Sequence, residues 1–115
     1  MKKSVNELNS DLFDNEEDKF SDPTYARKKA MDFLALREYG QKELILKLQS
    51  KGFSSDISTI IVEKLTDDGL QDDRRFAESY VRSRIAQGKG PIRIHYELEQ
   101  KKMPSNIIRS VIENT

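Results

Sequence analysis

Apolar side chains recur at spacings of three and four through the first half of the chain, which is the pattern of amphipathic helices. Three helices are predicted, over residues 23 to about 39, 41 to 51 and 55 to 68. Asp22 and Ser54 are suitable N-caps for the first and third, and Gly40, Gly52 and Gly69 supply the stops. The positions expected to face a core are Ala26, Ala30, Phe33, Leu34, Leu44, Ile45, Leu48, Ile57, Ile60, Ile61 and Leu65.

The same pattern restarts after Gly69 and predicts three more helices, which begin near residues 72, 91 and 104. Asp72 and Asp73 place carboxylates at the first N-terminus, Gly88 ends that helix, and Pro91 suits the first turn of the next. The inward positions are Phe76, Ala77, Tyr80, Val81, Ile85, Ile94, Leu98, Ile107, Ile108, Val111 and Ile112, with His95 as a further candidate. No segment of the sequence shows the alternation of a strand.

The two halves are internal repeats. A shift of 47 places Ala30 on Ala77, Phe33 on Tyr80, Leu34 on Val81 and Arg37 on Arg84. After the three-residue insertion 88–90, a shift of 50 places Leu44 on Ile94, Leu48 on Leu98, Phe53 on Met103 and Ile61 on Val111. In such arrays neighbouring units cover each other's apolar faces. The sequence therefore predicts an elongated all-α fold of tandem three-helix repeats, with repeat 1 at residues 23–71 and repeat 2 at residues 72–115.

Charge is unevenly distributed along a chain of 115 residues whose formal net charge is zero. Residues 1–22 hold three basic and seven acidic side chains, so residues 23–115 hold seventeen and thirteen. With few apolar groups, residues 1–22 are predicted to be a disordered acidic leader, either simply solvated or able to screen a basic surface. The absence of cysteine, of a signal peptide and of a run of roughly 18 apolar residues favours a soluble, cytoplasmic protein.

Basic residues are concentrated between Arg74 and Arg93, a segment with six arginine or lysine residues and one acid, Glu78. The candidates for binding a partner are Arg74, Arg75, Arg82, Arg84, Lys89 and Arg93. Arg75 and Arg82 are the stronger ones, because helical spacing places them on one face with Glu78 and neither coincides with an arginine of repeat 1. Arg84 also has a structural interpretation, either facing the carbonyls at the end of its helix or pairing with Glu97, in the way that its counterpart Arg37 would pair with Glu43. Guanidinium groups suit carboxylates and phosphates equally, so the pattern fits an acidic protein groove or a DNA backbone.

No arrangement of residues indicates catalysis, a cofactor, a metal or a small-molecule substrate. His95 is the only histidine and has no assignable nucleophile or second ligand, so a packed or partly exposed imidazole is expected. The acidic residues around Asp68 and Asp72 lack the spacing of a calcium loop and are better explained as helix ends. Tyr80 lies on the inward stripe, which favours core packing over stacking on a base.

These residues also carry a family resemblance, over residues 24 to 114. Gly69-Leu70, Asp73, Arg75-Phe76-Ala77-Glu78, Tyr80-Val81-Arg82-Ser83-Arg84, Gly88, Gly90-Pro91, Arg93-Ile94, Glu97-Leu98 and Lys101 resemble the second repeat of the RecX regulatory protein family. The resemblance implies an all-helical regulator that lodges in the groove of the RecA filament on single-stranded DNA. It also implies suppression of the ATPase, coprotease and strand-exchange activities of RecA.

Two departures from the family pattern stand out. Family members commonly have a third repeat, so this sequence is either a fragment or a short member, and Lys102 occupies a position where the motif has glycine, which alters a helix C-cap. The leading hypothesis is a non-enzymatic RecA regulator that acts through the basic face of repeat 2. The alternative is a stand-alone DNA-binding helical module, and a third hypothesis is a helical scaffold for an unrelated protein.

Overall fold

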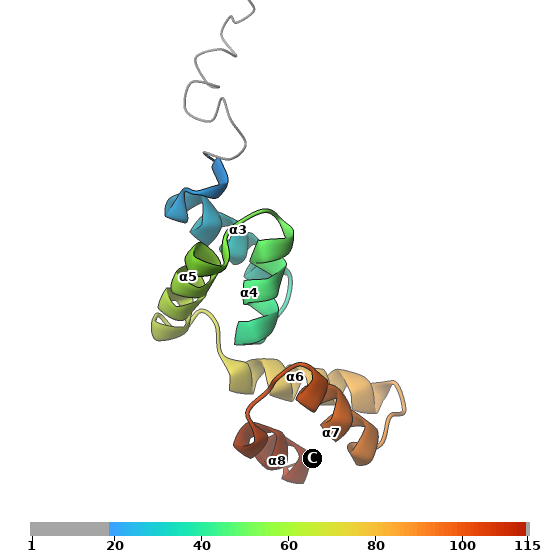
Figure 1. Cartoon of the computed structure of the whole chain (residues 1–115). Helices are drawn as coiled ribbons and strands as arrows, with labels where there is room; N and C mark the ends of the chain where they lie inside the picture. The colour runs from blue at the N-terminus through green and yellow to red at the C-terminus, as the bar shows by residue number, and fades with distance from the viewer. Residues whose placement is uncertain (1–18, 115) are drawn as a thin grey trace, which may run out of the picture.

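The computed structural model describes residues 19–114, and every regular element in that range is a helix. In chain order the elements are α3 (Pro23–Leu36), α4 (Gln41–Ser50), α5 (Ser55–Asp67), α6 (Asp73–Ala86), α7 (Pro91–Gln100) and α8 (Ser105–Glu113). Helices α3–α5 form one unit and α6–α8 a second, placed end to end (Figure 1). The predicted elongated, all-α tandem fold is confirmed. None of the described helices is long and apolar enough to cross a bilayer.

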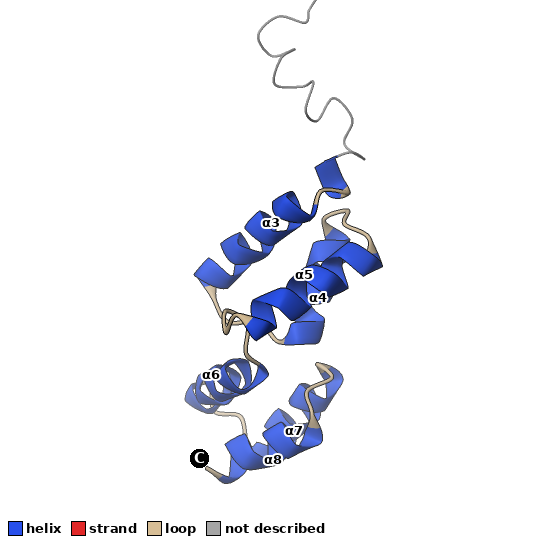
Figure 2. Ribbon diagram, turned by 90° about the vertical axis from the view of Figure 1, so that its left-hand side faces the viewer, coloured by secondary structure: helices blue, strands red, loops and turns tan. Residues whose placement is uncertain are grey.

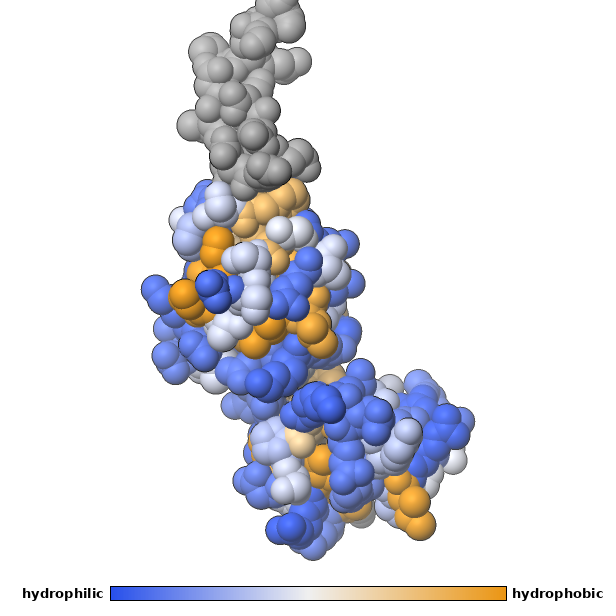
Figure 3. Space-filling model, in the orientation of Figure 1, coloured by the Kyte–Doolittle hydropathy of each residue, from blue (hydrophilic) through white to orange (hydrophobic). Residues whose placement is uncertain are grey.

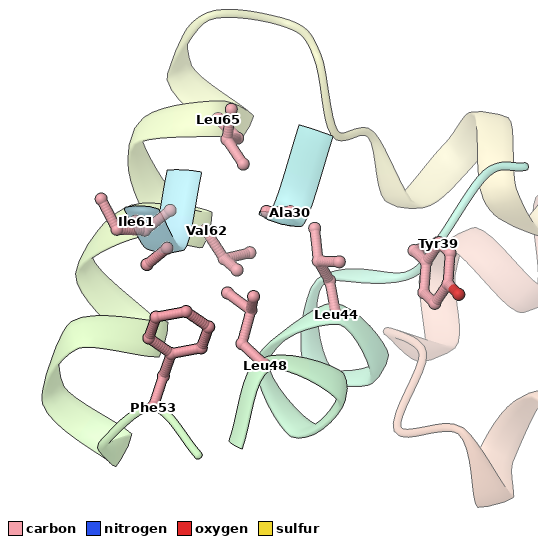
Figure 4. Close-up of a cluster of buried hydrophobic side chains, with 9 residues drawn as sticks. Ala30, Tyr39, Leu44, Leu48, Phe53, Ile61, Val62 and Leu65 are labelled. Carbon is pink, nitrogen blue, oxygen red and sulfur yellow. The ribbon is translucent and has the colours of Figure 1, made fainter. Parts of the chain in front are cut away.

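Each repeat folds around its own core. In repeat 1, α5 packs on α3 and α4, and in repeat 2, α8 packs on α6 and α7 (Figure 2). Figure 4 shows Leu44, Leu48 and Phe53 of repeat 1 gathered against Val62 and Leu65 of α5, with all five side chains buried. Burying one such leucine contributes about 1.5–3 kcal/mol. The principal helix–helix contacts lie within a repeat, so these two cores stabilise the fold.

The repeat register predicted from the sequence is also the register of the two cores. Leu48 and its counterpart Leu98 are both fully buried, and Phe53 and Met103 occupy the same buried position after α4 and α7. The predicted N-caps Asp22 and Ser54 are confirmed, because each accepts a hydrogen bond from a backbone N–H in the following turn, and Asp72, predicted only as an acid at a helix N-terminus, caps α6 in the same way. Local sequence signals therefore place most of the helices.

The first helix is shorter than its apolar pattern predicts, and Gly40 does not end it. Helix α3 stops at Leu36, after which Arg37 is extended, and Gly40 is the N-cap of α4. Tyr39 is buried in the connection, with the Arg37 guanidinium 3.7 Å from the centre of its ring. Tyr39 is only 6% exposed in this connection, so its burial favours the extended conformation of residues 37–39.

Two residues predicted to face inward are exposed instead, and His95 is partly exposed, which is one of the two states expected for it. Ile60 and Ile85 are 51% and 48% exposed, and the His95 imidazole is about half exposed, with Nδ1 3.7 Å from a carboxylate oxygen of Glu99. Each lies at the edge of its helical stripe, and the shallow contact between short helices covers only the centre of the stripe. In α5 the inner surface also includes Ser58, which the apolar pattern does not identify.

The leader prediction falls mainly on residues 1–18, which lie outside the described residues. The last residues of the predicted leader, from Lys19 on, contact repeat 1. Lys19 and Phe20 are helical, and the Phe20 ring packs edge-on against Phe53 with ring centres 5.1 Å apart. Tyr25 completes this aromatic group, and Lys19 lies 4.9 Å from the centre of the Tyr25 ring. Ordered packing therefore begins at least two residues before Ser21, where the sequence places its start.

Lys102, expected to alter a helix C-cap, keeps the positive φ of its glycine counterpart. Lys102 has φ of 62°, the one non-glycine residue with positive φ in the described range, and its repeat 1 counterpart Gly52 has φ of 117°. Both residues follow the end of a helix. A side chain in this left-handed region costs about 1–2 kcal/mol, so the substitution leaves the turn in place with added backbone strain.

Candidate interaction surface

The six candidate basic residues lie on α6, on the connection that follows it, and on the first turn of α7. They do not form one free stripe. Arg74, Arg75, Arg84 and Arg93 each contact a carboxylate, whereas Arg82 and Lys89 make no ion pair or side-chain hydrogen bond within residues 19–114. The candidates therefore divide into cations held by the fold and cations available to a partner.

Glu97 of α7 is the centre of the largest charged cluster. Its carboxylate accepts hydrogen bonds of 2.8 Å from Arg84 Nε and Nη2, of 2.8 Å from the Tyr80 hydroxyl and of 2.9 Å from Arg93 Nε. These bonds, that from Arg84 first, lower the pKa of Glu97 to about 2. Burial and the bond to Glu97 raise the pKa of Tyr80. The predicted Arg84–Glu97 pair and the packing role of Tyr80 are confirmed.

The corresponding cluster in repeat 1 involves Arg37, which pairs with Glu43 as the sequence predicts. Arg37 donates to both carboxylate oxygens, at 3.2 and 2.9 Å, and Lys101 of repeat 2 lies 3.6 Å away. Burial alone would raise the pKa of Glu43, but the hydrogen bond from Arg37 and the charge of Lys101 lower it below its usual value. The cluster therefore also joins the two repeats.

Arg75 is a second link between the repeats. Its Nε lies 3.1 Å from a carboxylate oxygen of Glu38 in repeat 1, and its two terminal nitrogens donate to the backbone carbonyls of Gly69 and Leu70, at 3.1 and 3.2 Å. All three acceptors belong to segments that precede α6. Binding of a partner by Arg75 stays a prediction, and the structure adds an intramolecular role that its position in the sequence does not indicate.

A polar junction beside Arg75 fixes the start of α6 against repeat 1. One carboxylate oxygen of Asp73 accepts hydrogen bonds from the backbone N–H of Gln41, at 2.7 Å, and from the side chain of Gln71, at 3.0 Å. The same Gln71 nitrogen, buried within the junction, donates to the carbonyl of Tyr39. A Cβ atom on Gly40 would lie 3.0 Å from the Met103 methyl, so glycine permits the close approach of the repeats. Sequence reasoning assigns Asp73 only to a helix end.

Arg82 is the most available guanidinium among the six candidates. It is exposed on α6 and borders a shallow depression of about 310 Å³ that Glu78, Val111 and Asn114 also line. Glu78 is held instead by Arg74, at 3.3 Å, and Arg74 donates a further hydrogen bond of 2.7 Å to Ser110 of α8. A free guanidinium can receive a carboxylate or phosphate without first breaking an ion pair.

Acidic and histidine side chains do not converge on a metal site in the part of the chain that the structure describes. Asp72 and Asp73 are at the N-terminus of α6, where the helix dipole favours negative charge, and Asp68 pairs with Arg27 at 2.9 Å. Their helix-end and ion-pair contacts explain the positions of these carboxylates.

Family models for RecX match both repeats: the first three-helix domain matches residues 26–65 and the second matches residues 72–112. A regulatory protein RecX from Halorhodospira halophila is 40% identical over 88 residues, which are 76% of this chain and 55% of that protein. Proteins of the same name from Chromohalobacter salexigens and Pseudomonas putida are 37% and 39% identical, over 76% and 69% of this chain and 57% and 51% of their own. The chain spans about half the length of the curated relatives it matches. With both domains matched in order, the chain belongs to the RecX regulatory protein family.

Proposed function

We propose that this chain is a non-enzymatic regulator that binds the RecA filament on single-stranded DNA. Binding inhibits the ATPase, coprotease and strand-exchange activities of the filament. The observation that carries the proposal is the match of both repeats, in order, to the two three-helix domains of RecX, whose curated members are named regulatory proteins. Because RecA acts on DNA in the cytoplasm, the proposal assigns the protein to that compartment.

Within this proposal, Arg82 and Lys89 make the principal charged contacts with the filament. Neither has an intramolecular carboxylate partner among the described residues, so neither has to exchange one ion pair for another on binding. Arg74, Arg84 and Arg93 strengthen the local positive potential while staying paired. Arg75 contributes chiefly by holding the two repeats in the orientation in which they enter the filament groove.

The test is co-sedimentation of the chain with RecA filaments on single-stranded DNA, together with the RecA ATPase rate. Arg82→Glu combined with Lys89→Glu should weaken binding by about tenfold or more and relieve inhibition in proportion, since two contacts change sign. Arg109→Glu is the matched control, because Arg109 is an exposed arginine of α8 with no ion pair in the described range. Equal inhibition by the double variant and the control would reject Arg82 and Lys89 as the contacts.

Direct DNA contact is the second candidate, because Arg82 and Lys89 would suit phosphates as well as carboxylates. A titration of single-stranded DNA without RecA separates the two functions. Binding through phosphates should weaken with salt by a logarithmic slope of about −0.7 for each contact. Tight RecA-free binding with such a slope, and no effect of the chain on the ATPase rate, would favour the DNA-binding module over the RecA regulator.

A further inference from the structure

The two repeats do not share a hydrophobic core. The buried apolar cluster of repeat 1 and the side chains packed against it lie between Phe20 and Leu65, and those of repeat 2 lie between Phe76 and Ile112. Figure 3 shows the repeats as two lobes that meet at a narrow neck with mostly hydrophilic surface. Neighbouring units move relative to each other unless a large apolar interface holds them. The contacts at this neck therefore decide how freely repeat 2 can turn on repeat 1.

The innermost contact between the repeats converges on one atom. Asp73 Oδ1, at the start of α6, accepts hydrogen bonds from the Gln41 N–H at 2.7 Å and from Gln71 Nε2 at 3.0 Å. Both donors belong to repeat 1, because the buried Gln71 side chain is also bonded to the Thr66 hydroxyl and to the Tyr39 carbonyl. The directional preference at an acceptor oxygen is broad. Bonds that meet at a single oxygen thus fix the position of α6 and leave its direction adjustable.

Two partly exposed ion pairs restrict that direction. Arg75 of α6 lies 3.1 Å from Glu38, and Lys101, the C-cap of α7, lies 3.6 Å from Glu43. We call these two contacts the bridging ion pairs. They hold repeat 2 through two different elements, so together they oppose rotation about Asp73. Their four side chains are between 22% and 45% exposed, and ion pairs in contact with water are weak and are screened by salt.

Separation of the bridging ion pairs leaves no buried charge without a partner. Glu43 keeps both hydrogen bonds from Arg37, at 3.2 and 2.9 Å, because these lie within repeat 1. Glu38, Arg75 and Lys101 are accessible to water, which solvates them once they separate. The breaking of an ion pair is costly chiefly where it strands a buried charge. The closed arrangement is therefore favoured by a small free energy that ionic strength can change.

We propose that the neck is an electrostatic hinge, in which Asp73 is the pivot and the bridging ion pairs set the angle between the repeats. High ionic strength, or loss of the pairs, releases repeat 2 to sample a wider range of angles while both cores stay intact. Hinges place the angular change in a few residues at the ends of elements, which here are residues 68–72, between α5 and α6. The hinge goes beyond the proposed function, because it makes the distance from repeat 1 to the exposed Arg82 adjustable whatever partner Arg82 binds.

The distance between two spin labels, one on each repeat, measures this angle. The chain has no cysteine, so Ser55→Cys in α5 and Ser83→Cys in α6 give two unique and exposed labelling sites. Double electron–electron resonance then gives the distribution of distances between the labels. The measurement is made at salt concentrations of about 0.1 M and about 1 M, where the Debye length is about 10 Å and about 3 Å.

Two further variants are made in the labelled chain. Glu38→Ala combined with Lys101→Met removes both bridging ion pairs and leaves Asp73 and its donors in place. Glu78→Ala is the matched control, because Glu78 forms an ion pair of similar exposure with Arg74, at 3.3 Å, inside α6. Circular dichroism of each sample reports whether the helices stay folded.

In the wild-type labelled chain, the distance distribution should broaden by about 1.5-fold or more at high salt, with no loss of helicity. The double variant should already have the broad distribution at low salt and should respond little to added salt, whereas Glu78→Ala should behave as the wild type does. A wild-type distribution of constant width would overturn the hinge without any substitution at the neck. A double variant that keeps the full salt response, a control that matches the double variant, or broadening that accompanies loss of helicity would overturn it equally.

Discussion

The same substitution at two positions of α6 should have opposite consequences. Arg75 and Arg82 are seven residues apart, about two helical turns, and both are exposed arginines. Arg75 contacts Glu38 and two backbone carbonyls that precede α6, whereas Arg82 has no ion pair or side-chain hydrogen bond in residues 19–114. We expect Arg75→Glu to destabilise the fold and Arg82→Glu to leave stability unchanged while it weakens binding.

The magnitude follows from the contacts of Arg75. Its side chain and that of Glu38 are 45% and 33% exposed, so the ion pair contributes only about 0.2–1 kcal/mol. The two bonds to carbonyls add about 0.5 kcal/mol each after allowance for solvent exposure. Reversal of the charge therefore costs about 1–2 kcal/mol. For a domain of this size, that lowers the melting temperature by roughly 4–10 °C. Arg82→Glu should stay within about 0.5 kcal/mol.

Thermal unfolding followed by circular dichroism measures the loss of stability expected in Arg75→Glu. Inhibition of the RecA ATPase measures the loss of binding expected in Arg82→Glu. A double-mutant cycle with Arg75→Ala and Glu38→Ala isolates the ion pair, with an expected coupling of about 0.5 kcal/mol. If Arg75→Glu melts at the wild-type temperature, or if Arg82→Glu is the less stable of the two, the division into structural and available arginines is wrong.

Three further predictions concern the turn after α7, the junction and the charged cluster. Lys102→Gly should stabilise the chain by about 0.5–1 kcal/mol in chemical denaturation, because glycine relieves the left-handed strain; a loss of stability would contradict the assigned conformation. Gly40→Val should cost about 1–3 kcal/mol through overpacking against Met103 and increase the radius of gyration in X-ray scattering, and an unchanged scattering curve would count against the close contact. The depressed pKa of Glu97, about 2 against an ordinary 4.5, means that its carboxylate stabilises the fold above pH 4.5 and loses this effect as the pH falls towards 2. The difference in melting temperature between wild type and Glu97→Gln should therefore be largest near neutral pH and disappear near pH 2, and a pH-independent difference would exclude the charge as its cause.

Much of the candidate surface could be predicted wherever the repeat alignment supplied a second example. Arg37 and Arg84 occupy one register, and each was predicted to pair with a nearby glutamate, Glu43 or Glu97, as the structure confirms. Arg75 has a partner that local reasoning could not supply, because Glu38 lies 37 residues earlier, in the other repeat. A helical face identifies which side chains point outward. It does not identify which of them another part of the chain will neutralise.

The amino-acid sequence by itself determined the helices, their caps and the repeat register, because helix formation depends on neighbours three and four residues apart and on the residues at each end. The tertiary structure decided where repeat 2 sits on repeat 1, through Gly40, Gln71 and Asp73, and hence which cations are paired and which apolar surface is exposed. The physical reason is that these contacts join residues thirty or more positions apart, and their energies depend on distances that only the packed chain sets.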